Sequence, residues 1–362
     1  MTTRSLGRLP RVIVSSVIRS SRQGESHGGL YLADLETGAT ERVLDWNDPS
    51  INWEGRGADR GLRGIAFHGG LVHAAASDEI FVFDPDFRRV ASFRNPYLKH
   101  CHEIFIEGDL LFATSTGFDS VLVYDLAKRS WIRGYLLRVG GLGKRLRRLH
   151  FPSRPGFLVF DPAGDDGPAP GDSTHLNSAF VHGGVAYVCG TGTRAVWAIE
   201  EGATGPPRLS RYATVPYGSH NARPWRDGVL LNHTQTDQVA HVDRRGRLLQ
   251  SFPLVHYPER DLLHASLAEE IARQAFGRGL AVIDEELFVS GSSPATVTVY
   301  RFGQREPVKS INLTMDVRNS VHGLEVWPYE REPRPAKIGG PRAGSEADPG
   351  NGLTGERGAA ST

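Results

Sequence analysis

Short apolar runs alternate with polar turns along most of the chain. The clearest succession follows Arg63, where turns rich in His, Gly, Ser, Asp and Pro separate four runs, at 64–67, 71–75, 80–83 and 90–93. Runs of this length, rich in β-branched and aromatic residues and bounded by turn residues, are typical of strands. The pattern therefore predicts four consecutive antiparallel strands in this stretch.

The same succession recurs along the chain with a period of about 40–45 residues. Five copies are recognisable, beginning at Arg63, His102, His175, His220 and Arg278. A sixth is divided between the two ends of the chain: three runs lie at 12–18, 29–34 and 40–44, and one follows His322. Four-stranded units of this period are typical of propeller blades, and dividing one blade between the ends closes the ring and removes a free sheet edge. The sequence therefore predicts an all-β fold, a six-bladed β-propeller.

Over residues 12–327 the pattern resembles that of β-propeller proteins. The sequence has no Gly-His…Trp-Asp signature of the WD-repeat kind. At the level of the fold it resembles the six-bladed enzymes and binding proteins of the strictosidine-synthase and lactonase type. A shared fold does not imply a shared activity.

The repeat defines the domain organisation. We expect an N-terminal tail at 1–10, a propeller domain at 11–329 and a C-terminal tail at 330–362. The C-terminal tail is rich in Pro, Gly, Glu, Arg and Ser, a composition that predicts disorder.

Two insertions interrupt the repeat, at 139–173 and 256–276. The first contains an apolar run at 157–160 that suggests an extra strand. The second has apolar residues at helical spacing over 259–276, which predicts a short helix.

Each repeat opens with His or Arg, often with Gly or Asn beside it, just before its first strand. In a propeller the first strand of each blade lines the central channel. The links into these strands and the turns between second and third strands open on one face, where both insertions also emerge. Loops on a rigid scaffold usually build the binding site. We therefore expect a site at this mouth of the channel, formed by Arg63, His102, His175, Asn177, His220, Asn221, Arg278 and His322.

Four of the openings carry histidines that could hold a divalent transition metal, with Fe(II) as the first choice: His102, His175, His220 and His322. Imidazole suits Fe, Cu or Zn better than Ca or Mg. In this respect the chain resembles the carotenoid-cleaving oxygenases, which hold Fe(II) with four histidines on a propeller axis. The alternative is that the histidines, with Asn177 and Asn221, only satisfy neighbouring strands and channel water.

Arg63 and Arg278 occupy the two remaining openings. The planar guanidinium suits a carboxylate or a phosphate, so these residues, with Asn177 and Asn221, are predicted to bind an anionic substrate. The alternative is an ion pair between blades, with Glu103 or Glu325 as the partner.

Three functional hypotheses follow. The first is a metal-dependent oxidoreductase or lyase that acts on a small anionic molecule, with His220 and His322 as catalytic residues. The second is a non-catalytic ligand- or protein-binding propeller. The third is a metal-free His/Arg acid–base lyase or epimerase. The sequence has no His-Glu-x-x-His motif. It has no phosphate loop of the right spacing either, so no nucleotide cofactor is predicted.

Composition and charge limit the classes of partner and the location that we expect for the chain. A net charge of +1 argues against nucleic-acid binding through a charged face, and no apolar segment is long enough for a membrane span. The basic N-terminal stretch at 4–19 is interpreted as a first strand, not a signal peptide. Only two cysteines occur, Cys101 and Cys189, which favours a reducing, cytoplasmic location. The sequence carries no prediction of the oligomeric state.

Overall fold

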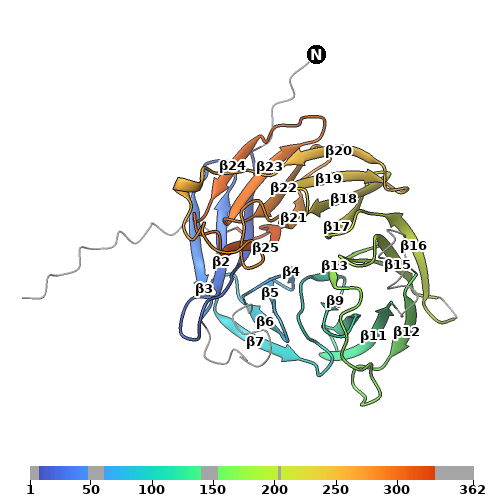
Figure 1. Ribbon diagram of the computed structural model, residues 1–362. Coiled ribbons are helices and arrows are strands. Elements are labelled where there is room, and N and C mark those ends of the chain that lie inside the picture. Colours follow the sequence, from blue (N-terminus) through green and yellow to red (C-terminus); the bar gives the residue numbers. More distant parts are fainter. Residues whose placement is uncertain (1–7, 48–60, 140–153, 203–204, 331–362) are drawn as a thin grey trace, which may run out of the picture. The chain divides into compact units, whose positions relative to one another are not determined.

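A computed structural model describes residues 8–47, 61–139, 154–202 and 205–330. These residues form six antiparallel sheets, which are the blades of a propeller (Figure 1). The predicted all-β, six-bladed fold is confirmed. Almost all of the predicted C-terminal tail lies outside the described residues, as do residues 1–7 of the N-terminal tail and 140–153 of the first insertion.

The blades are numbered here from the first complete repeat, and their strands run outwards from the axis. Blade 1 consists of β4 (Ile65–His68), β5 (Leu71–Ala76), β6 (Glu79–Phe83) and β7 (Arg89–Arg94). Blade 2 consists of β8 (Ile104–Glu107), β9 (Leu110–Ser115), β10 (Ser120–Asp125), β11 (Ser130–Arg138) and β12 (Gly156–Phe160). Blade 3 consists of β13 (Leu176–His182), β14 (Val185–Gly190), β15 (Ala195–Glu200) and β16 (Arg208–Thr214).

Blade 4 consists of β17 (Ser219–Trp225), β18 (Gly228–His233), β19 (Gln238–Asp243) and β20 (Leu248–Pro253). Blade 5 consists of β21 (Arg278–Val282), β22 (Leu287–Ser292), β23 (Thr296–Arg301) and β24 (Lys309–Asn312). Blade 6 combines β25 (Asn319–Val326) with β1 (Arg11–Ile18), β2 (Gly28–Asp34) and β3 (Thr40–Asp45).

Blade 6 closes the ring as the divided repeat predicted. The C-terminal β25 pairs antiparallel with β1, with Val12 opposite Val326 and Ile18 opposite Asn319. The Ser15 hydroxyl donates to the carbonyl of Arg63 in blade 1 and accepts the backbone N–H of Gly323. The closing blade is therefore hydrogen-bonded to its neighbour as well as through its own sheet.

The core is divided among the interfaces between blades. In the described part of the chain, six clusters of buried apolar side chains each join one pair of neighbouring blades. Successive side chains of a strand point to opposite faces. Val12 and Val14 of β1 accordingly pack towards blade 5, whereas Ile13 between them packs towards blade 1. Both faces of a blade are covered, which explains why strands such as β2 and β10 are buried at every position.

The first insertion adds a strand to blade 2. The run at 157–160 forms β12, which pairs antiparallel with the outer strand β11. The ring of Phe160 lies over Gly134, where a Cβ atom would come within 2.3 Å of it. The suggested extra strand is therefore confirmed.

The helix predicted over 259–276 is wrong. The described residues there contain one short 3₁₀ turn, Glu259–Asp261, followed by irregular backbone. Leu263 and Ile271, which should have faced the core, are 57% and 40% exposed. Backbone groups of the segment bond outwards instead: Leu263 exchanges hydrogen bonds with Met315 and Val317, and Ala275 N–H donates to Ser293. These bonds reach the β22–β23 turn of blade 5 and the link between β24 and β25. They replace the bonds that a continuous helix would make. No helix in the described ranges is long and apolar enough to cross a membrane.

Candidate functional site

Four of the six openings coincide with β-bulges in the inner strands, those of blades 3 to 6. The register shifts at Asn177 in β13, at Asn221 and Ala222 in β17, at Gly279 in β21, and at His322 and Gly323 in β25. Bulges redirect side chains and are common beside functional sites. Asn221 and Gly279 have φ values of 49° and 74°, a backbone region that Asn and Gly tolerate best. Backbone geometry therefore explains the Asn beside His220 and the Gly beside Arg278.

The bulges and links bring the opening side chains together around the axis. We call this set the axial ring; it consists of Arg63, His102, His175, His220, Arg278 and His322. Arg63 Nη1 donates to His102 Nε2 over 2.9 Å, and the ring centroids of His102 and His175 are 5.3 Å apart. His322 and Arg278 lie near enough to lower the pKa of both His102 and His220. The convergence predicted from the repeat is present in the fold.

All four histidines are held through Nδ1 by an oxygen close to them in the chain. Nδ1 of His102 lies 2.8 Å from the His100 carbonyl oxygen, and Nδ1 of His220 lies 2.9 Å from that of Gly218. Nδ1 of His322 lies 3.3 Å from the Ser320 carbonyl oxygen, and Nδ1 of His175 lies 3.0 Å from the Asp172 carboxylate. A carbonyl or carboxylate oxygen accepts hydrogen bonds, so Nδ1 carries the proton in each case. On a neutral ring, Nε2 is then the nitrogen with the lone pair.

His102 and His220 are neutral at physiological pH. Burial lowers the pKa of each well below 6.5. The Arg63 guanidinium lowers the pKa of His102 further, and that of Arg278 lowers both. His220 is 4% exposed, and its Nε2 has no hydrogen-bond partner within the described part of the chain. The axial ring therefore combines two permanent cations with the uncharged imidazoles of His102 and His220.

The turns and insertions predicted at this mouth of the channel do support the axial ring. Thr116 and Thr234, from the turns after β9 and β18, place their hydroxyls 2.9 and 3.0 Å from Nδ1 of His102 and His220. Asp172 comes from the first insertion. From the second, the Phe276 ring lies 4.1 Å from the Arg278 guanidinium carbon.

Asp119 is a supporting residue that the sequence did not indicate. It is fully buried and accepts hydrogen bonds from the backbone N–H and hydroxyl groups of Ser173 and Thr174. Arg138 Nε donates to the same carboxylate over 3.0 Å. Asp119 thus fixes the segment directly before His175. Ser173 and Thr174 lie more than fifty residues from Asp119 in the chain, so local patterns could not reveal this role.

Asn177 and Asn221 bond to neighbouring blades. Asn177 Nδ2 donates to the Ser219 carbonyl over 3.1 Å. Asn221 Oδ1 accepts the Gly279 N–H over 2.9 Å, and its Nδ2 donates to Glu103 over 2.6 Å. These contacts match the structural alternative for both residues, and their predicted contact with substrate stays a prediction.

The ion pair across the channel involves a different arginine from those expected. Glu325 pairs with Arg223 of β17, and Glu103 bonds to Asn221. Arg223 belongs to the His220 opening but was assigned no role from the sequence. Arg63 and Arg278, the two predicted partners, instead face the imidazoles.

The metal prediction remains untested by the geometry. Across the described ranges, no three His, Cys, Asp or Glu side chains lie close enough together to hold a metal ion.

The two cysteines are buried, and burial raises the pKa of each thiol to about 12, so neither is an activated nucleophile.

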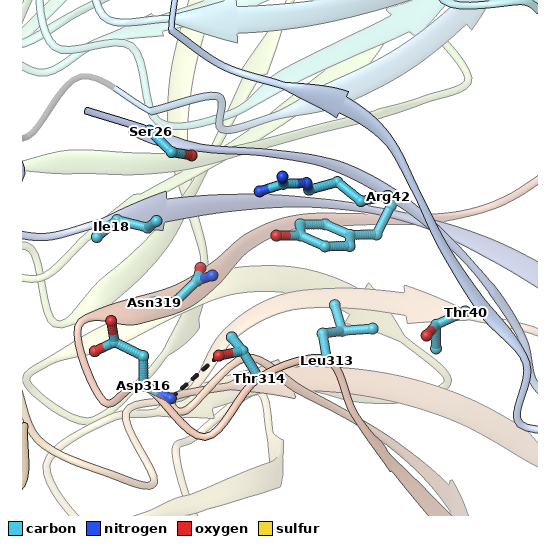
Figure 2. Close-up of a pocket in the computed structure, with 9 residues that line it drawn as sticks. Ile18, Ser26, Thr40, Arg42, Leu313, Thr314, Asp316 and Asn319 are labelled. Atoms are coloured by element: carbon cyan, nitrogen blue, oxygen red, sulfur yellow. Dashed lines mark hydrogen bonds between the residues drawn. The ribbon is translucent and has the colours of Figure 1, made fainter. Parts of the chain in front are cut away.

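A separate cavity of about 400 Å³ lies between blade 6 and the link that leads into it (Figure 2). Tyr31, Arg42, Asp316 and Asn319 are among its lining residues, and it shares none with the axial ring. Asp316 is paired with Arg318 and His264. The sequence predicted no site here.

Known proteins resemble this chain only distantly. No protein-family model and no curated protein matches the chain. Among solved structures, the chain is similar to apo AztD from Citrobacter koseri, with 10% identity and a TM-score of 0.47 over 87% of this chain and 97% of the other. It is also similar to a protein of unknown function from Bacteroides caccae, with 11% identity and a TM-score of 0.46 over 87% of this chain and 98% of the other. The six-bladed β-propeller is shown by the sheets of the chain itself.

Proposed function

We propose that the axial ring binds a small anionic molecule on the propeller axis. The observation that carries the proposal is the convergence of two guanidiniums and four imidazoles; the Asp172 carboxylate beside them bonds to His175. Guanidinium groups keep their charge at any physiological pH, and their planar donors match a carboxylate or a phosphate. An anion placed among them gains from both charges in surroundings of low dielectric constant.

The neutral imidazoles give this site a means of acid–base chemistry. A lone pair on Nε2 can accept a proton from a bound molecule, and the oxygen at Nδ1 stabilises the imidazolium that forms. His220, with its Nε2 free of other hydrogen bonds within the described residues, is the first candidate for such a base, and His322 is the second. This arrangement favours a lyase or an epimerase over a purely binding propeller.

A divalent transition metal is the second candidate ligand, and the tautomers of the histidines favour it. Metal-binding histidines usually donate their second ring N–H to an oxygen, which is the arrangement of all four rings here. In spacing the site does not fit a metal as it stands, because Arg63 donates to Nε2 of His102 and no three ligands among the described residues are close enough. Fe(II), the first choice, would supply Lewis acidity or bind O₂.

Anion binding is tested with sulfate and oxalate as probes, by titration calorimetry on the full chain. We expect the Arg63→Gln/Arg278→Gln double variant to bind at least tenfold more weakly, since two charged hydrogen-bonding groups are lost. Arg247→Gln is the matched control, because Arg247 is exposed in the β19–β20 turn. Equal affinity in the double variant and the control would contradict the proposal.

The metal is tested by elemental analysis after anaerobic reconstitution with Fe(II). The comparison is a variant with Ala at His102, His175, His220 and His322. About one metal ion per chain, lost in a variant that still folds, would support the second candidate. A wild-type chain that retains no Fe, Cu, Zn or Mn would rule it out.

A further inference from the structure

The cavity beside blade 6 is formed in part by two pairs of facing side chains (Figure 2). Tyr31 of β2 lies opposite Arg42 of β3, and Ile18 of β1 lies opposite Asn319 of β25. Directly opposed residues of antiparallel strands have neighbouring side chains on one face of the sheet. The link between β24 and β25 contributes further lining residues. The volume of about 400 Å³ falls within the roughly 300–1,000 Å³ of small-molecule sites.

Asn319 brings to this cavity a side-chain amide that the fold leaves unsatisfied. The residue is 4% exposed, and its Oδ1 has no hydrogen-bond partner within the described part of the chain. Its backbone N–H, in contrast, donates to the Asp316 carbonyl over 2.9 Å. Polar groups buried to this extent normally have a partner. A molecule bound in the cavity could provide one.

The two charged side chains that line the cavity are each neutralised by a neighbour. Arg42 pairs with Asp45 over 3.4 Å, within β3. Asp316 pairs with Arg318 over 2.8 Å at the start of β25. Because both charges are already balanced, the cavity has no excess charge to attract an ion.

We propose that this cavity binds an uncharged molecule with several hydroxyl groups, a single sugar or a polyol of similar size. A hydroxyl both donates and accepts, so it fits either end of the Asn319 amide, the Arg42 guanidinium, which only donates, and the Asp316 carboxylate, which only accepts. Ile18 and Leu313 provide apolar surface for the carbon-bound hydrogens of such a molecule. Further hydroxyl groups line the cavity, those of Ser26, Thr40 and Thr314.

This site is independent of the proposed function, because the cavity shares no lining residue with the axial ring. A molecule the size of a hexose should bind with a Kd of about 1 mM, given the free energy that each atom of a small ligand usually contributes.

The test is saturation-transfer NMR on the full chain, which detects binding this weak. The probes are D-glucose, D-galactose, D-mannose and myo-inositol, and glycine is the zwitterion for comparison. We expect at least one of the four hydroxylated probes to bind, and glycine not to bind.

Two substitutions locate the bound probe. Asn319→Leu removes the amide and keeps a side chain of similar size, and Arg42→Gln removes the guanidinium. Each should weaken binding by about tenfold, since a hydrogen-bonding group in the site is lost. Asn319→Leu should unfold at no lower urea concentration than the wild type, because the fold itself leaves Oδ1 without a partner in the described ranges.

Arg301→Gln is the matched control for Arg42→Gln. Both arginines form an ion pair within their own blade, but Arg301 pairs with Glu286 in blade 5 and does not line the cavity. It should bind the probe as the wild type does. The Arg63→Gln/Arg278→Gln variant should also bind it normally, whatever its affinity for anions.

Three results would overturn the proposal: no binding of any of the four hydroxylated probes, binding that neither Asn319→Leu nor Arg42→Gln weakens, or tighter binding of glycine. Loss of binding in the Arg63→Gln/Arg278→Gln variant would place the probe in the axial ring and would overturn it too. If Asn319→Leu does not fold, Arg42→Gln still decides, because the Arg42 side chain is 49% exposed.

Discussion

The free energy of unfolding depends on pH through the buried carboxyl of Glu103. Its pKa is raised from 4.5 to about 7 in the fold, so the folded chain binds a proton there that the unfolded chain releases at lower pH. The stability associated with this group is fully present below about pH 4.5 and is lost as the pH rises to about 7. Glu103→Gln should therefore raise the free energy of unfolding by up to about 3 kcal/mol above neutral pH and change it little below pH 4.5. Urea denaturation at both pH values measures this difference, and an equal effect at both would contradict it.

Two adjacent serines of β1 give a second prediction for single side chains. Ser15 and Ser16 are both fully buried, but only Ser15 bridges blades, through the Arg63 carbonyl and the Gly323 N–H. Ser16 Oγ has no hydrogen-bond partner in the ranges that the structure covers. Ser15→Ala should cost about 1–3 kcal/mol, since it leaves a buried N–H unsatisfied, whereas Ser16→Ala should be close to neutral. Denaturant titration of both variants checks this, and similar losses would show that the bridge is not the cause.

At this scale the sequence indicated which residue types meet, but not how they are held. The repeat placed one His or Arg at each opening, and that was sufficient to predict the axial ring. The Nδ1 bonds to Gly218 and Asp172 depend on the path of short links, and the role of Asp119 depends on residues far away in the chain. Neither kind of contact leaves a periodic signal.

Among the elements, the bulged inner strands depend on glycines at close approaches. A Cβ atom on Gly323 would lie 2.1 Å from the carbonyl oxygen of Arg63, in the neighbouring blade. Gly323→Ala should therefore displace the β25 bulge and lower the free energy of unfolding by about 3 kcal/mol, because backbone must shift. Gly156→Ala in β12 is the control, because its Cβ would meet only an ordinary contact at 3.5 Å. Thermal unfolding of the two variants compares them, and a Gly323→Ala variant as stable as the control would contradict the prediction.

The strands were predictable because each is a short apolar run between turn residues, and because each is repeated. The segment 259–276 was predicted wrongly, because apolar residues at helical spacing indicate a helix only where their common face packs against a core. Here Leu263 instead forms an isolated bridge with Asp316. The backbone groups that bond to this segment belong to blade 5 and to the link between β24 and β25, so tertiary contacts overrode the local pattern.

For the whole molecule, stability depends on completing the ring. Every blade packs against two neighbours, and removing β25 would expose apolar faces of blades 5, 6 and 1 together. A chain ending at residue 318 should fail to fold cooperatively, whereas one ending at 330 keeps β25 and the contacts of Trp327 and Tyr329 with Phe67. The longer truncation product should unfold within a few degrees of the full chain, as judged by calorimetry. A stable fold for the chain that ends at 318 would show that the closing strand is dispensable.

The architecture was the most predictable level, since six copies of one pattern, one of them divided, define the number of blades and the closure. The chemistry was the least predictable, because the same convergence of His and Arg is compatible with an anion, a metal or internal hydrogen bonding. What distinguishes these is the tautomer and the spacing of the imidazoles, and neither is encoded in the repeat.

The paired ends of blade 6 make the starting point of the chain arbitrary for the ring. Trp327 N–H donates to the carbonyl of Arg11 over 2.9 Å, so the end of β25 and the start of β1 lie side by side. A short linker between them would leave the sheet unchanged, and new ends could be opened in an exposed hairpin such as that at Gly69 and Gly70. Such a circular permutant would keep all six interfaces between blades, with every strand retaining its neighbours.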